Sequence, residues 1–165
     1  MDAGVPVTRG SYLLIARLET AAEIAVGRLG TFVFAAGWYA YAGSALGPGG
    51  LRARLERHRR ADKRLHWHID YLLQESVVEA GWYLASVDRL ECAWAAALAG
   101  LSGHRQIPPR FGASDCRCPG HLVYCPVRPL DQQIVDALQA AGVLRGAQDG
   151  ACPLQCERYV TSTSL

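Results

Sequence analysis

Five side chains in this sequence could together carry out acid–base chemistry on a charged ester. They are two tyrosines, an arginine, a histidine and a glutamate, at Tyr12, Tyr41, Arg54, His58 and Glu91. Hydrolysis of a phosphodiester needs a base for water, a cation near the phosphate and a carboxylate-held metal that stabilises the leaving oxygen. These residue types can supply all three. Because a free phenol titrates near ~10, a tyrosine base requires a cationic neighbourhood that lowers its pKa.

An arginine-rich segment after the second tyrosine predicts the helix that provides this neighbourhood. A Gly-Pro-Gly-Gly break precedes it, and we expect the helix to run from about Leu51 to Ala61. At 100° per residue, Arg54 and His58 fall on the same side as the apolar Leu51 and Leu55 and therefore face inward. Arg54 is a candidate for the transition-state cation. A helix-surface histidine is the alternative interpretation of His58.

Positive charge is concentrated in one short segment. The net charge is only +2, yet seven of the 17 Lys and Arg residues lie between positions 52 and 64. Such a segment could meet a phosphate backbone, or it could be a solvated helix face. Trp67 could stack a base of single-stranded nucleic acid, or belong to the core with histidines at its border. The residues expected to contact nucleic acid are Arg52, Arg57, Arg60, Lys63, His66, Trp67 and His68.

Glu91 is expected near the start of a second helix, for which Asp88 is the predicted N-cap. On that helix Glu91 shares a face with the apolar Trp94 and Leu98. A carboxylate at a core edge calls for a metal, a cation or a proton, because an unpaired buried charge costs several kcal/mol or more. The alternative is a partly exposed glutamate stabilised by the helix dipole.

The cysteines suggest a second chemistry. Six are present, and without an export signal they indicate reduced thiols or metal ligands rather than a disulfide framework. Thiolate and imidazole ligands suit Zn²⁺, for which Cys116, Cys118, His121 and Cys125 are the candidate ligands. Small buried side chains with a hydrogen-bonding histidine are the alternative. Cys152 and Cys156 could complete such a site or be unrelated to it.

The hydrophobic pattern predicts one domain of α+β class, a small antiparallel sheet flanked by helices. We expect this domain to span residues 1–146, followed by a Cys-containing C-terminal tail, 147–165. No apolar run reaches the roughly 20 residues of a membrane span, so we expect a soluble, cytoplasmic protein without a membrane partner. Strands are predicted at Gly10–Leu18, Glu23–Gly27, Gly30–Phe34, Gly37–Gly43, Val77–Ala85 and Leu122–Cys125, and a further helix near Leu130–Ala141.

The order of these motifs resembles the GIY-YIG nuclease superfamily. Gly10-Ser11-Tyr12 and Tyr41-Ala42-Gly43 match its two tyrosine signatures, with Ser11 and Ala42 in place of Ile and an inserted hairpin between them. Lys63–Leu73 and Phe111–Leu122 look like signatures of its Uri subgroup. The resemblance covers most of residues 10–126.

The resemblance implies a role for each candidate residue. Either Tyr12 or Tyr41 would activate water, Arg54 would steady the phosphate, and His58 would support a tyrosine or the phosphate. Glu91 would hold hydrated Mg²⁺ or Mn²⁺.

A metal-dependent DNA endonuclease is therefore the leading hypothesis, with single-stranded DNA as the first candidate substrate and duplex DNA or RNA left open. No obligate protein partner is evident. The alternatives are a nucleic-acid-binding module that does not cut, and a basic segment that contacts an acidic protein. Binding with a steep salt dependence but no product would distinguish the first of these.

Overall fold

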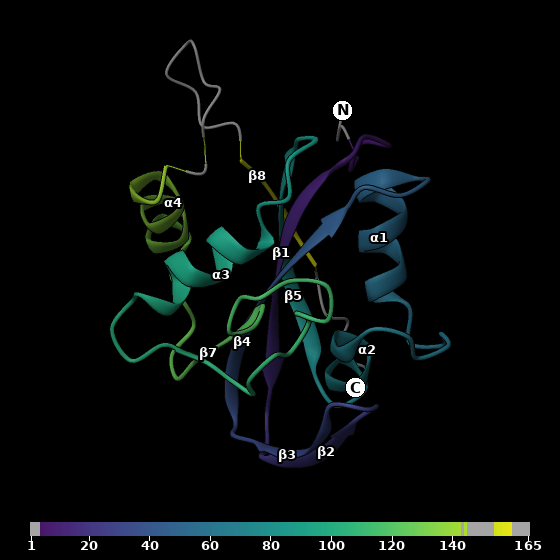
Figure 1. Ribbon diagram of the computed structural model, residues 1–165, viewed down its shortest axis with the longest axis vertical. Coiled ribbons are helices and arrows are strands. Elements are labelled where there is room, and N and C mark those ends of the chain that lie inside the picture. Colours follow the sequence, from purple (N-terminus) through teal and green to yellow (C-terminus); the bar gives the residue numbers. More distant parts are fainter. Residues whose placement is uncertain (1–3, 143, 145–153, 160–165) are drawn as a thin grey trace.

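A six-stranded antiparallel sheet forms the centre of the molecule. The computed structural model describes residues 4–142, 144 and 154–159, and its strands lie in the order β6-β7-β4-β1-β5-β8 (Figure 1). The predicted α+β class is confirmed. The strand bounds are β1 Gly10–Leu18, β4 Gly37–Ala45, β5 Val77–Ala85, β6 Arg105–Gln106, β7 Leu122–Cys125 and β8 Gln155–Arg158.

Helices cover both faces of this sheet, α1 and α2 on one side and α3 and α4 on the other (Figure 1). Their bounds are α1 Gly50–Arg59, α2 His68–Leu73, α3 Glu91–Ala99 and α4 Asp131–Ala140. Because side chains alternate along a strand, Leu14 of β1 joins the core under α1 and α2, and Leu13 joins the core under α3. The central strand is therefore apolar on both faces.

The insertion between the two tyrosine motifs is a hairpin, as predicted. Strands β2 (Ala22–Val26) and β3 (Gly30–Phe34) pair with each other as a separate two-stranded sheet. Gly27 has a φ of +48° at the turn, a region that glycine enters at little cost. Val26 and Phe34 pack into the core on the α1 and α2 side, so the hairpin covers one end of that core.

The start of α3 differs from the prediction. Asp88 is not the N-cap, because the helix begins at Glu91 with Leu90 as its cap residue. The backbone N–H of Leu90 donates a 3.2 Å hydrogen bond to the hydroxyl oxygen of Ser11, on β1. A distant strand thus supplies the capping oxygen that the local sequence suggested would come from Asp88.

The tail contributes one strand to the sheet. Strand β8 pairs antiparallel with β5, for example Cys156 opposite Trp82. Residues 147–153 and 160–165 of the predicted tail, Cys152 among them, lie outside the described residues. None of the helices in the described part of the chain combines the length and apolarity needed to cross a bilayer.

Candidate active site and metal cluster

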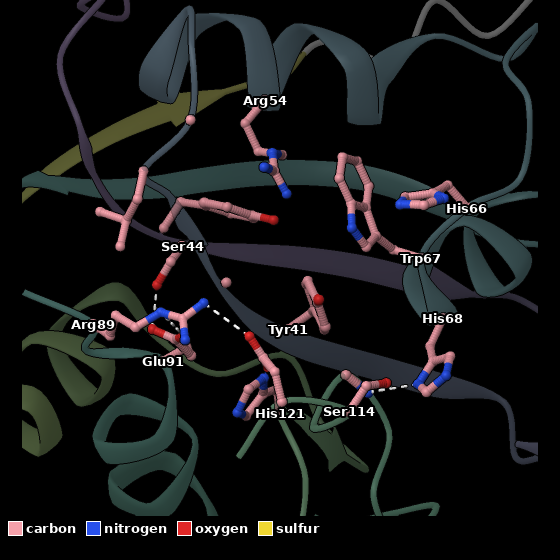
Figure 2. A pocket seen from close by; sticks show the side chains of 16 residues that line it. Tyr41, Ser44, Arg54, His66, Trp67, His68, Arg89, Glu91, Ser114 and His121 are labelled. Carbon is pink, nitrogen blue, oxygen red and sulfur yellow. Dashed lines mark hydrogen bonds and ion pairs between the residues drawn. The ribbon is translucent and has the colours of Figure 1, made fainter.

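Four of the five candidate catalytic residues line one pocket of about 390 Å³, namely Tyr12, Tyr41, Arg54 and Glu91 (Figure 2). The fifth, His58, lies behind Tyr12 with only 2% of its surface exposed. His66, Trp67 and His68 also line this pocket. Segments that are far apart in the sequence are therefore brought together around a single polar cavity.

Residue 43 must be a glycine because the side chain of Tyr12 occupies the space that a Cβ would fill. The two residues are direct partners in the register between β1 and β4, and the Tyr12 ring lies across the bare Cα. A Cβ on Gly43 would stand 2.4 Å from the Tyr12 hydroxyl oxygen. The ring of Tyr41 is 6.4 Å from that of Tyr12, centroid to centroid, so the two phenols share one wall of the pocket.

The hydroxyl of Tyr12 is hydrogen-bonded to Nε2 of His58 at 2.8 Å. Burial lowers the pKa of His58 to about 3, against the attraction of Asp70, so the imidazole is neutral at pH 7. Nδ1 of His58 lies 4.0 Å from Oδ1 of Asp70. The negative charge of Asp70 favours the tautomer with the proton on Nδ1, which leaves Nε2 to accept the hydrogen bond from Tyr12.

Burial raises the pKa of Tyr12, and the positive charge of Arg54 opposes this shift. The phenol is thus protonated in the resting site. Burial likewise raises the pKa of Tyr41. Of the two tyrosines, only Tyr12 has a hydrogen bond to an imidazole within the described residues, and this distinguishes two phenols that the sequence left equivalent.

Asp70, which the sequence analysis did not single out, organises this side of the pocket. Its carboxylate is fully buried and accepts hydrogen bonds of 2.8 and 2.9 Å from the guanidinium of Arg57. It also accepts 2.9 Å bonds from the backbone N–H groups of His66 and Trp67. Burial alone would raise the pKa of Asp70, but these hydrogen bonds outweigh it and lower the pKa. An acid three residues after a helix N-cap was the signal for this role.

Two guanidinium groups already contact Trp67. The guanidinium carbons of Arg54 and Arg57 lie 4.0 and 4.2 Å from the centroid of its ring, well within cation–π range. Trp67 therefore positions Arg54 at the pocket. Base stacking on this ring stays a prediction, and it would have to accommodate the two arginines. We call Tyr12, His58, Asp70, Arg57 and Trp67 together the tyrosine wall.

Glu91 forms the opposite side of the pocket with Ser44 and Arg89 (Figure 2). Asp115 lines the same pocket, and we call these four residues the acidic wall. Glu91 is 6% exposed and shares its buried face with Trp94 and Leu98, as predicted. The hydroxyl of Ser44 donates a hydrogen bond to its carboxylate. Arg89 Nε lies 3.6 Å from Oε1 of Glu91.

Arg89 also links Glu91 to Asp115, because its second nitrogen donates a 2.9 Å hydrogen bond to the Asp115 carboxylate. The side chains of Arg89 and Asp115 are both more than half exposed, at 57% and 60%. Neither residue was predicted as part of the site, although Asp115 lies within the Phe111–Leu122 signature and Arg89 stands two residues before Glu91.

A Cys/His cluster able to hold a metal ion lies beside the acidic wall. Its members are Cys92, Cys116, Cys118 and His121, whose ligand atoms all lie within 4.8 Å of one another. Nε2 of His121 is 3.3 Å from the sulfur of Cys92 and 3.4 Å from that of Cys116. The sulfurs of Cys116 and Cys118 are 3.2 Å apart.

The predicted cluster was therefore right in three ligands and wrong in the fourth. Cys125 lies four residues after His121 on strand β7, which advances about 3.3 Å per residue, so its sulfur is carried away from the other thiols. Cys125 is buried, and its sulfur lies 3.7 Å from Nδ1 of His104 and 3.7 Å from the carbonyl oxygen of Val123. Cys92 takes its place because α3 packs beside the loop that carries Cys116.

Arg110 holds that loop in shape. It has a φ of +65°, and its guanidinium donates hydrogen bonds to the carbonyl oxygens of Ala113, Cys116 and Cys118. Its backbone N–H donates to the carbonyl of Pro119 at 2.6 Å. The two cysteines are thereby presented on the same side of the loop without depending on a disulfide, since both thiols are free.

Some of the basic residues predicted to contact nucleic acid are hydrogen-bonded within the protein, and others are exposed to solvent. Arg57 is bound to Asp70, Lys63 donates a 2.8 Å hydrogen bond to the carbonyl of His58, and Arg52 donates one to Val5. Arg60 is exposed. A second pocket shares His66 with the first, and it is lined by Arg57, Arg60, Asp62, Lys63, Arg64 and His66.

His68 joins helix α2 to the loop that carries the cluster cysteines. Its Nδ1 accepts a 2.8 Å hydrogen bond from the backbone N–H of Gly112. Of the residues predicted to contact nucleic acid, His68 is thus engaged within the protein, and contact between any of them and nucleic acid stays a prediction.

The fold and the pocket define an α+β protein in which buried tyrosines, an arginine and a carboxylate share one polar cavity beside a metal-competent Cys/His cluster. The model of a family described as domain of unknown function DUF123 matches residues 11–143. The chain belongs to that family. No curated protein and no solved structure matched the chain.

Proposed function

We propose that the protein is a metal-dependent endonuclease of the GIY-YIG superfamily, of the Uri type, that hydrolyses DNA phosphodiester bonds. The observation that carries the proposal is the convergence of Tyr12, Arg54 and Glu91 on one pocket. Each supplies a different requirement of the reaction: a proton acceptor for water, a cation for the phosphate and a carboxylate for a metal. A protein that only binds nucleic acid has no need of this combination.

Tyr12 is the proposed base. A water molecule in the pocket would give its proton to the Tyr12 oxygen as the phenol proton passes along the existing 2.8 Å hydrogen bond to Nε2 of His58. A bound phosphate would favour this transfer, because its negative charge stabilises a protonated His58. The positive charge of Arg54 lowers the pKa of Tyr12, which also favours loss of the phenol proton. Arg54 would in addition stabilise the charge that develops on the phosphate.

Glu91 fits a hard divalent cation. Its carboxylate faces the pocket with Asp115 nearby, and oxygen is the ligand type that Mg²⁺ and Mn²⁺ prefer. Its partner Arg89 is largely exposed and can move without a loss of core packing. Glu91 would hold the ion together with water molecules, and the ion would supply Lewis-acid stabilisation of the leaving oxygen.

The Cys/His cluster fits a different metal. Three thiols and an imidazole are soft and borderline ligands that select Zn²⁺ rather than Mg²⁺. We therefore propose two metals of different chemistry, Zn²⁺ at the cluster and Mg²⁺ or Mn²⁺ at Glu91.

DNA is the proposed partner, with single-stranded DNA first. His66 belongs to both pockets, so a strand whose phosphate lies near Arg54 could continue toward the open cations Arg60 and Arg64. Phosphate contacts of this kind supply affinity without sequence preference. A non-catalytic module on the same scaffold is the second candidate, and it is favoured by the resting ion pair between Arg89 and Glu91.

The test is cleavage of labelled single-stranded DNA, duplex DNA and RNA with Mg²⁺, Mn²⁺ or EDTA. Glu91→Gln should lower metal-dependent cleavage about 100-fold or more, and the exposed Glu23→Gln on β2 should not. Arg54→Ala should behave like Glu91→Gln, whereas Arg28→Ala, in the exposed turn of the hairpin, should match the wild type.

Circular dichroism checks that each variant is folded. Salt-dependent binding without product under every condition would replace the nuclease with the non-catalytic module. Cleavage that survives both Glu91→Gln and Arg54→Ala would refute the roles of these residues.

A further inference from the structure

We infer that Zn²⁺ at the Cys92, Cys116, Cys118 and His121 cluster is a closed structural ion that sets the position of Glu91, so that zinc occupancy controls metal binding in the pocket. This inference rests on the proposed function, because it gives Glu91 the role of divalent-metal ligand. It goes beyond that function by making one metal site a condition for the other.

The ligand set predicts a site without an open position. Four protein ligands complete the tetrahedral shell that zinc adopts in structural sites, whereas catalytic zinc sites keep one position for water. The ligand atoms come from helix α3, the loop after Arg110 and the residue before β7, and they converge within 4.8 Å. Such an ion would therefore join three segments of the chain rather than act on a substrate.

The two ring nitrogens of His121 face different neighbours. Nδ1 of His121 faces Gly112, because it lies 3.3 Å from where a Cβ on that glycine would stand, while Nε2 faces the thiols. Nε2 is therefore the nitrogen that a metal at the cluster would meet. The backbone of Gly112 in turn lines the pocket.

Each segment that carries a ligand also carries a residue of the pocket. Cys92 directly follows Glu91, Cys116 directly follows Asp115, and His121 itself lines the cavity. The cluster therefore borders the acidic wall along its length. A displacement of Cys92 or Cys116 would be transmitted to Glu91 or Asp115 through a single peptide unit.

Core packing holds helix α3, but few polar side chains restrain the Glu91 carboxylate. The backbone just before Glu91 is held by the Ser11 hydroxyl, which accepts a hydrogen bond from the N–H of Leu90, but Arg89, which pairs with the Glu91 carboxylate, is 57% exposed. Exposed ion pairs contribute little positional restraint. Ser44 also donates a hydrogen bond to the carboxylate, and zinc bound to Cys92 would add a further constraint one residue after Glu91.

The first measurement is the zinc content of the purified full chain by plasma mass spectrometry. We expect one zinc per chain in the wild type and in the control Cys156→Ser, whose exposed thiol lies on β8. Cys118→Ser and Cys116→Ser should each lose most of the metal. Cobalt replacing zinc should give the absorption of a tetrahedral thiolate site. Wild-type protein without zinc and without this cobalt spectrum would overturn the site.

The second measurement tests the coupling through Mn²⁺ binding, followed by electron paramagnetic resonance. Protein from which zinc has been removed by a chelator should bind Mn²⁺ roughly 10-fold more weakly than zinc-loaded protein, as expected when an outer contact of a metal ligand is lost. Adding zinc back should restore the affinity. If a cysteine variant fails to fold, this comparison still decides the matter because it uses the wild-type chain.

Glu91→Gln distinguishes zinc binding at the cluster from Mn²⁺ binding in the pocket. It should keep one zinc per chain and lose Mn²⁺ binding. Equal Mn²⁺ affinity with and without zinc would overturn the coupling. A zinc-loaded wild type that neither binds Mn²⁺ nor cleaves nucleic acid would overturn the proposed function and the coupling together, while the zinc content would still stand as evidence for the cluster.

Discussion

The two sides of the pocket are held in different ways. The tyrosine wall is an interior network, in which Asp70 is fully buried and His58 is 2% exposed. In the acidic wall the ion pair between Arg89 and Asp115 joins two side chains that are more than half exposed. Buried hydrogen-bonded networks fix geometry, whereas exposed ion pairs are worth 0–1 kcal/mol. The folded chain alone can therefore fix the tyrosine wall, whereas we propose that bound metal completes the acidic wall.

The largest effect should come from removing the hydroxyl that the tyrosine wall orients. Tyr12→Phe keeps the ring but loses the proton relay to His58, so metal-dependent cleavage should fall by about 10²–10⁴-fold. Single-turnover cleavage of labelled single-stranded DNA measures this. The control is Tyr39→Phe, because the Tyr39 hydroxyl lies outside the pocket lining and donates a hydrogen bond to the carbonyl oxygen of Ala35. A larger loss in Tyr41→Phe than in Tyr12→Phe would make Tyr41 the base.

The next largest effect should be a difference in the free energy of unfolding between a variant of the tyrosine wall and a variant of the acidic wall. Asp70→Asn leaves the guanidinium of Arg57 without its carboxylate, and breaking a buried pair in this way should cost about 3 kcal/mol. Asp115→Asn removes an exposed partner of Arg89 and should cost at most about 1 kcal/mol. Urea unfolding of both variants gives the comparison. Equal losses in the two variants would show that the tyrosine wall is no better fixed than the acidic wall.

A smaller cost is expected from crowding the tyrosine wall. Gly43→Ala places a Cβ 2.4 Å from the Tyr12 hydroxyl, and overpacking of this kind costs about 2 kcal/mol. Cleavage should fall with it, because the hydroxyl must shift. Gly47→Ala is the matched control, since nothing lies within 4 Å of its Cβ. Wild-type thermal unfolding and cleavage in Gly43→Ala would show that Tyr12 does not need this glycine.

The pH dependence of stability should reveal the buried histidine. The pKa of His58 is about 3 in the folded protein and near ~6.5 in the unfolded chain. The unfolded state therefore binds more protons between these values, and the free energy of unfolding should fall by roughly 1 kcal/mol per pH unit as the pH drops below ~6.5. His58→Gln should show a shallower fall in urea unfolding at each pH. Identical slopes would mean that His58 is not held neutral.

Short-range patterns predicted most of the fold. Gly10–Leu18, Val77–Ala85 and Leu122–Cys125 were expected as strands from their apolar and β-branched content, and all three have those bounds. The helical period alone placed Arg54 and His58 on the inward side of α1, and the structure confirms that His58 is buried.

Long-range contacts account for what the sequence did not reveal. The hydroxyl of Ser11 accepts a hydrogen bond from the N–H of Leu90, 79 positions later, at the start of α3. A pattern confined to neighbouring residues therefore pointed to Asp88 as the N-cap. Cys92 joins thiols 24 and 26 residues further along because of tertiary packing, and no local spacing signals it. The role of Asp70 depends on Arg57, which lies in a different helix.

The most direct test of the central claim, that the two walls form one reaction centre, is the cleavage rate of Tyr12→Phe, Glu91→Gln and the double variant. If both residues act in the same step, the double variant should cleave no more slowly than the slower single variant, because residues that act as a unit are strongly non-additive. Losses that multiply in the double variant, or a wild-type protein without metal-dependent cleavage, would contradict the account.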